Sequence, residues 1–93
     1  MTDTPPPNIH VTLHSLRTPR HASGHTTVQA RTIREVMAAL CNADLEFANR
    51  VLAPDGRIRS TIVFCVGSRV QRNLDMKLEA DSELVIISAI TGG

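Results

Sequence analysis

The segment that most constrains the fold of this chain is its one long stretch with a clear helical period. Thr32 is followed three residues later by Glu35, which is the spacing of a capping box at a helix N-terminus. Apolar residues then recur on a single stripe: Ile33, Val36, Met37 and Leu40. We therefore predict a helix from Thr32 to about Asn42. A single helix covers one face of a sheet and leaves the other face partly open.

The segments on either side of this helix have the patterns of β-strands. Ile9, Val11 and Leu13 alternate with polar residues, as in a strand with one buried face. Further strands are expected at residues 26–30, 57–66 and 84–90, with 57–66 the longest and a short edge strand within 70–78. Residues 45–52 are expected to add a short turn of helix. The predicted class is therefore α+β, with four to five strands and one main helix packed on one face.

Composition narrows the range of functions. The 93 residues suffice for one domain, and ten basic against nine acidic residues give a net charge of +1. This balance gives no general attraction to nucleic acid, and Trp and Tyr, which would stack on bases, are absent. The longest apolar run, Ile62–Val66, is too short to cross a membrane. Residues 1–8 contain three consecutive prolines and are expected to form a disordered leader.

The cysteines and histidines do not have the spacing of a metal site. Cys41 and Cys65 stand among apolar residues without a CxxC pair, so buried, reduced thiols in a cytoplasmic protein are expected. His10 and His14 would lie ~13 Å apart on a strand, too far to bind one ion. His21 and His25 are expected in a loop without a paired carboxylate. We predict neither a metal nor a bound cofactor.

The last expected strand runs directly into two glycines. Ile90 and Thr91 connect it to Gly92 and Gly93, the last residue of the sequence. Glycine has no Cβ, so residues 91–93 are expected to form a flexible tail thin enough to enter a narrow channel. Gly93 would present a bare carboxylate at its tip. A frayed terminus without a role is the alternative.

Several stretches in this order resemble one family. They are Thr32-Ile33-Arg34-Glu35-Val36, Pro54-Asp55-Gly56-Arg57-Ile58-Arg59, the acidic segment 79–83 and the ending 84–93. Together they resemble the ubiquitin-like sulfur carriers of the ThiS/MoaD type, over residues 9–93. The resemblance implies a β-grasp domain over residues 9–90 with a mixed sheet. Residues 16–25 and 55–59 look most similar to the carrier of a cysteine-biosynthesis route, whereas residues 66–78 are closer to the molybdopterin type, so the pathway stays open.

The resemblance also implies a function. A separate adenylating enzyme would use MgATP to join the Gly93 carboxylate to AMP, and sulfide or a persulfide would then displace AMP to leave a thiocarboxylate. Ile90, Thr91 and Gly92 would thread the tail into that enzyme. A second partner would accept the sulfur for cysteine, molybdopterin, thiamine or another sulfur-containing metabolite. The chain would be a cosubstrate and not itself an enzyme.

A docking surface follows from strand periodicity. If Leu84 and Ile86 point at the helix, then Val85 and Ile87 point outward, beside outward-facing Val63 and Cys65. Such an apolar patch is typical of a partner site. The alternatives are that a loop or a weak homodimer covers these residues. Arg57 and Arg59 are expected either on a solvated strand face or against an acidic surface of a partner.

Two other functional classes remain open. The chain could be a ubiquitin-like modifier joined through Gly93 to a lysine of another protein, a reaction that begins with the same adenylation. It could also be a β-grasp interaction module whose two terminal glycines have no role. Adducts of higher mass favour the modifier, and a thiocarboxylate consumed by a small-molecule acceptor favours the carrier.

Overall fold

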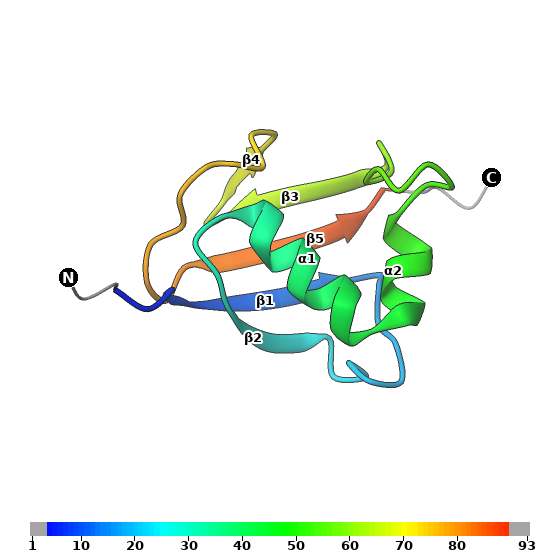
Figure 1. The fold of residues 1–93 in the computed structure, drawn as a ribbon, viewed down its shortest axis with the longest axis horizontal. Helices are drawn as coiled ribbons and strands as arrows, with labels where there is room; N and C mark the ends of the chain where they lie inside the picture. Colours follow the sequence, from blue (N-terminus) through cyan, green and yellow to red (C-terminus); the bar gives the residue numbers. More distant parts are fainter. Residues whose placement is uncertain (1–3, 90–93) are drawn as a thin grey trace.

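The structure is a computed structural model that describes residues 4–89. Ile90, Thr91, Gly92 and Gly93, which include the expected tail, therefore lie outside the described residues. Within the described part there are five strands and two helices (Figure 1). In chain order they are β1 (Asn8–His14), β2 (His25–Gln29), α1 (Ile33–Ala43), α2 (Leu45–Val51), β3 (Ile62–Val66), β4 (Arg69–Gln71) and β5 (Glu83–Ser88).

The five strands form one mixed sheet in the order β2-β1-β5-β3-β4. β1 and β5 are neighbours in this sheet and run parallel although they come from opposite ends of the chain, and all other neighbours are antiparallel. A parallel pair needs a crossover connection, and here the helices lie within that connection. Figure 1 shows α1 crossing one face of the sheet. The expected α+β arrangement with a mixed sheet is confirmed.

The core lies between α1 and the face of the sheet that it covers. Val11 pairs with Leu84 and Leu13 pairs with Ile86, and all four side chains are buried. The predicted apolar stripe of α1 completes this layer, with Ile33, Val36, Met37 and Leu40 all buried. The apolar residues that alternate along β1 and those that form the stripe of α1 therefore pack in one core, as the sequence indicates.

The start of α1 has a variant of the expected capping box. Thr32 is the N-cap, and its Oγ1 accepts a hydrogen bond from the Glu35 backbone N–H at 3.2 Å. The Glu35 carboxylate does not return to the N-cap but accepts from the Arg31 N–H at 2.9 Å, one residue earlier. Two backbone donors at the helix start are thus satisfied, which stabilises its position.

The second helix, α2, occupies the residues where a short turn of helix was expected. Asp44 is the C-cap of α1 and also the N-cap of α2. Its backbone N–H donates to the Leu40 carbonyl at 3.0 Å, and its side chain accepts from the Phe47 N–H at 3.2 Å. Phe47 and Val51 then extend the core below α1. Asp44 therefore caps the end of α1 and the start of α2, and it is the one residue between these two helices.

The prediction that residues 57–66 form the longest strand is wrong. β3 begins only at Ile62, and the longest strand is β1. The Arg59 N–H donates to the Val51 carbonyl at 2.8 Å, and the Arg59 carbonyl accepts from the Ile62 N–H in a turn. These bonds use the backbone groups that a strand would offer to β5. Smaller differences are the start of β1 at Asn8 and the inclusion of His25 in β2.

Candidate functional site

The four predicted docking residues meet on the open face of the sheet. Val63 pairs with Ile87 and Cys65 pairs with Val85, so their side chains point to the same side. All four are half-buried, in contrast to the buried Ile62, Phe64, Leu84 and Ile86 that alternate with them. We call Val63, Cys65, Val85 and Ile87 the docking patch. Val70 of β4 pairs with Cys65 and is 56% exposed, so it extends the patch toward the edge of the sheet.

Polar residues of β1 and β2 border this patch. Thr12 pairs with Val85, and His14 pairs with Ile87, across the parallel β1–β5 ladder. The Thr12 hydroxyl lies 3.3 Å from Nδ1 of His25, which stands opposite it on β2. The open face is therefore apolar over β5, β3 and β4 and polar over β1 and β2. This division gives the docking patch a defined border.

The chain is held in place up to the residues that precede the expected tail. Ser88 pairs with Ile62, and the Ala89 N–H donates to the Thr61 carbonyl at 2.8 Å. We call Ser88 and Ala89 the tail root. β5 thus carries two residues of the docking patch and ends at the tail root. Any partner that covers the patch is consequently close to the point from which residues 90–93 continue.

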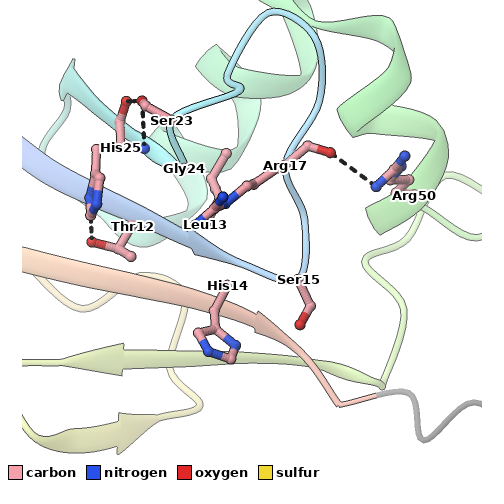
Figure 2. A pocket seen from close by; sticks show the side chains of 9 residues that line it. All are labelled: Thr12, Leu13, His14, Ser15, Arg17, Ser23, Gly24, His25 and Arg50. Atoms are coloured by element: carbon pink, nitrogen blue, oxygen red, sulfur yellow. Dashed lines mark hydrogen bonds between the residues drawn. The ribbon is translucent and has the colours of Figure 1, made fainter.

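Two shallow hollows share part of their lining, and one of them includes Ser88 of the tail root. The first, of about 400 Å³, is lined by four parts of the chain (Figure 2): the end of β1, the following loop, His25 at the start of β2 and Arg50 of α2. Its residues are Thr12, Leu13, His14, Ser15, Arg17, Ser23, Gly24, His25 and Arg50. The second, of about 330 Å³, is lined by Ser15, Leu16, Asn49, Arg50, Arg59 and Ser88. The hollows share Ser15 and Arg50, and neither lining contains a carboxylate.

The arginines of these hollows are positioned by backbone contacts. Figure 2 shows Arg50 reaching from α2 to the Arg17 carbonyl, to which its Nη1 donates at 3.1 Å. The Arg17 side chain runs back across Gly24, where a Cβ would lie 3.0 Å from Arg17 Nε. Gly24 also has a φ of +79°, a conformation that glycine adopts without strain. Glycine at this position therefore allows both the positive φ of the backbone and the path of the Arg17 side chain across it.

A buried polar cluster fixes the same loop to the junction of the helices. The Thr18 hydroxyl donates to Asp44 Oδ2 at 2.5 Å, and His21 Nδ1 lies 2.9 Å from the same oxygen. The hydrogen bond from Thr18 is the main reason that the pKa of Asp44 is lowered to about 2, helped by the Phe47 N–H and by His21 and opposed by burial. The expectation that His21 lacks a paired carboxylate is wrong. The N-capping position of Asp44 is a signal that could have suggested part of this cluster.

The two arginines that were expected on one strand face lie in different surroundings. Arg59 lines the second hollow beside Ser88. Arg57 instead lies near Asp55, with 4.0 Å between Nε and Oδ2, and borders a separate hollow that also includes Cys41. Residues 57–61 lie outside the strands, which explains the difference, because the period-two alternation of a strand does not apply to them.

The cysteines remain free thiols, and both are half-buried. Burial is the main cause of the raised pKa of Cys41, and the carboxylate of Asp44 adds to it. Over residues 4–89, no three His, Cys, Asp or Glu side chains lie close enough together to hold a metal ion. None of the helices in that part of the chain is long and apolar enough to cross a membrane.

Comparison with known proteins gives matches in structure but not in sequence. No protein-family model matches the chain, and no curated protein matches it. The crystal structure of SAMP1 from Haloferax volcanii is similar with a TM-score of 0.76 at 19% identity, covering 92% of this chain and 99% of that one. The solution structure of small archaeal modifier protein 1 from Methanosarcina acetivorans gives 0.75 at 10% identity, covering 98% and 100%.

A third solved structure extends the comparison. The Haloferax volcanii HVO 2177 protein has a TM-score of 0.70 at 16% identity, and the match covers 100% of this chain and 92% of that one. The identities are low, but each match spans nearly the whole of both chains. Together with the sheet order β2-β1-β5-β3-β4, these likenesses show that the chain has the β-grasp fold that its sequence resemblance implies.

Proposed function

We propose that the chain is a sulfur carrier whose Gly93 carboxylate is activated by a partner enzyme. The carboxylate attacks the α-phosphorus of ATP, pyrophosphate leaves, and an acyl adenylate forms. Hydrosulfide then adds to the acyl carbon, AMP leaves, and the product is a C-terminal thiocarboxylate that passes its sulfur to an acceptor enzyme. The catalytic groups and MgATP belong to the partner, so the chain itself is a cosubstrate.

The observation that carries this proposal is the layout of β5. Val85 and Ile87 belong to the docking patch, and the same strand ends at Ser88, where the tail root begins. Four residues follow Ala89 in the sequence, so an extended tail reaches at most ~14 Å beyond the tail root. A partner bound to the docking patch must therefore hold ATP within this reach of the tail root. Holding two reacting groups in the right geometry can supply a large part of the rate enhancement of such a transfer.

Protein modification is the second function that the structure supports. The solved structures that resemble this chain include two described as small archaeal modifier protein 1. In this alternative, a lysine amine of a target protein attacks the activated Gly93 carbonyl and forms an isopeptide bond. The docking patch and the tail root serve the same purpose in both reactions, because both begin with adenylation.

Intact-mass spectrometry of the purified chain tests both functions. The chain is incubated with a candidate adenylating enzyme, MgATP and a sulfide source, with a variant lacking Gly93 as the control. A sulfur carrier gains the mass difference of one oxygen exchanged for sulfur, and the gain disappears with the acceptor enzyme. A modifier appears instead on proteins of higher mass. An unchanged mass with every adenylating enzyme of the source organism contradicts both proposals.

A further inference from the structure

Three arginines from separate parts of the chain line the two hollows, and two of them share the second hollow with Ser88 of the tail root. Arg17 follows β1, Arg50 belongs to α2, and Arg59 lies in the turn before β3. Arg50 lines both hollows, Arg17 lines the first, and Arg59 lines the second together with Ser88 of the tail root. We call Arg17, Arg50 and Arg59 the basic collar. Arginine contributes a positive charge and a planar set of N–H donors.

Little negative charge opposes the basic collar. Glu46 lies 3.7 Å from Arg50 at the i,i+4 spacing, but both side chains are about half exposed, at 50% and 48%. Exposed pairs of this kind interact weakly. In the part of the chain that the structure describes, neither Arg17 nor Arg59 forms an ion pair. The acidic residues Glu79, Asp81 and Glu83 gather at the opposite end of β5, which begins at Glu83.

This arrangement makes the attraction for anions local. The net charge of the chain is only +1, so the molecule as a whole attracts polyanions weakly. An anionic group that enters the second hollow, however, is next to both Arg50 and Arg59, which line it together with Ser88 of the tail root. Arginine prefers carboxylate and phosphate ligands because its planar fork can make two parallel hydrogen bonds to them.

We propose that the basic collar binds acidic side chains at the mouth of the channel through which the activating enzyme receives the tail. This inference rests on the proposed function. An extended tail places Gly93 up to ~14 Å from Ala89, so the collar stays outside the channel while the carboxylate reacts. Carboxylates of the enzyme at that mouth, and not the phosphates of ATP, are therefore the ligands. The docking patch supplies the apolar contact, and the collar fixes which way the tail points.

Charge reversal with a matched control tests the collar in the enzymatic reaction. Pyrophosphate release is measured against carrier concentration for Arg59→Glu, with Arg57→Glu as the control, because Arg57 lies outside both hollows. We expect Arg59→Glu to raise the KM for the carrier roughly fivefold, with a smaller salt dependence and an unchanged kcat, since rim charges mainly affect association. Arg57→Glu should behave like the wild type. Equal KM values for wild type and Arg59→Glu overturn the proposal.

A second measurement needs no enzyme. Nuclear magnetic resonance spectra of the ¹⁵N-labelled chain are recorded during addition of hexaglutamate, inorganic tripolyphosphate or hexalysine. Hexaglutamate should shift the amides of Ser15, Arg50, Arg59 and Ser88, and hexalysine should not. The double variant Arg50→Glu/Arg59→Glu should lose these shifts. Shifts spread over the whole surface, or a response to tripolyphosphate alone, contradict an acidic protein partner.

The two measurements separate the failure of the inference from that of the proposed function. In one outcome, the wild type releases no pyrophosphate with any adenylating enzyme but still binds hexaglutamate at the collar. In that case the proposed sulfur-carrier function is wrong, and the proposal that the collar binds acidic groups is retained. If pyrophosphate is released normally by Arg59→Glu, the collar is wrong and the proposed function stands. Thermal unfolding of each variant shows whether it folds, and Arg59→Glu is the safer variant because the Arg50 side chain also bonds the Arg17 carbonyl.

Discussion

The two faces of β5 carry nearly the same aliphatic side chains but have different surroundings. Leu84 and Ile86 face α1 and are completely buried. Val85 and Ile87 face away from the helices and remain half-buried beside Val63 and Cys65. Burial in a packed core contributes to stability, whereas apolar surface left on an uncovered sheet is available to a partner. Alternate residues of one strand therefore separate the buried core from the open apolar surface to which we propose that a partner binds.

The largest expected effect is on the covered face. Ile86→Ala should lower the free energy of unfolding by ~2–5 kcal/mol, because it leaves a cavity among residues that are already fully packed. Val85→Ala, on the other face of the same strand, is the matched control and should cost much less. Denaturant unfolding of both variants checks this difference. A larger loss for Val85→Ala would mean that the two faces of β5 have been exchanged.

Acid titration tests the polar cluster on the covered side. The pKa of Asp44 is lowered to about 2 in the folded chain, so its carboxylate stabilises the fold at pH values above its ordinary pKa near 3.8. This contribution, about 2 kcal/mol, is lost as the pH falls from about 4 toward 2. Asp44→Asn should be less stable than wild type at neutral pH and should lose less on acidification. Parallel curves for the two proteins between pH 4 and pH 2 would exclude this role.

The open face is tested by its effect on docking. Val85→Asp places a charge in the docking patch and should raise the carrier concentration needed for half-maximal pyrophosphate release by about tenfold. Because the tail is intact, the maximal rate should recover at high carrier concentration. Thr27→Asp, on the polar strand β2 of the same face, is the control. Identical titrations for Val85→Asp and wild type would assign the partner surface to another part of the molecule.

The smallest of these effects is in the loop between β1 and β2. Gly24→Ala should cost about 1 kcal/mol, because Gly24 has a φ of +79° and a Cβ there would press on Arg17 and on the Leu13 carbonyl. Gly67→Ala, with a φ of +62° but no atom within 4 Å of the added carbon, is the control for backbone strain alone. Thermal unfolding distinguishes them, and equal costs would mean that the contact with Arg17 contributes nothing.

Local patterns predicted the parts of the fold that depend on a single element. The stripe of α1 and the alternation in β1 and β5 require only residues near one another in the sequence, and all three are confirmed. The turn from Arg59 to Ile62 was missed because the Arg59 N–H donates to the Val51 carbonyl of α2, an interaction that strand propensity does not describe. The sequence pattern of residues 57–66 is that of a strand, but tertiary contacts override it.

Sites assembled from distant segments were the least predictable. Thr18 and Asp44 are 26 residues apart, and the basic collar joins residues 17, 50 and 59. Such groupings form because the loop after β1 packs near α2. The period of hydrophobic residues along the sequence does not predict a contact between distant segments of this kind. The docking patch could be predicted because it follows from the alternation of two strands that pair with each other. Its residues were correctly placed together, and its role remains a proposal.

The most direct test of the account is pyrophosphate release by a chain that lacks Gly93. The deletion moves the carboxylate back by ~3.5 Å along an extended tail, and reacting atoms must approach within ~3–3.5 Å. We predict that release is lost at every carrier concentration while the unfolding midpoint stays at the wild-type value. Val85→Asp, in contrast, should recover as its concentration rises. Normal release from the Gly93 deletion would contradict both the sulfur carrier and the modifier, and would leave the β-grasp domain as an interaction module.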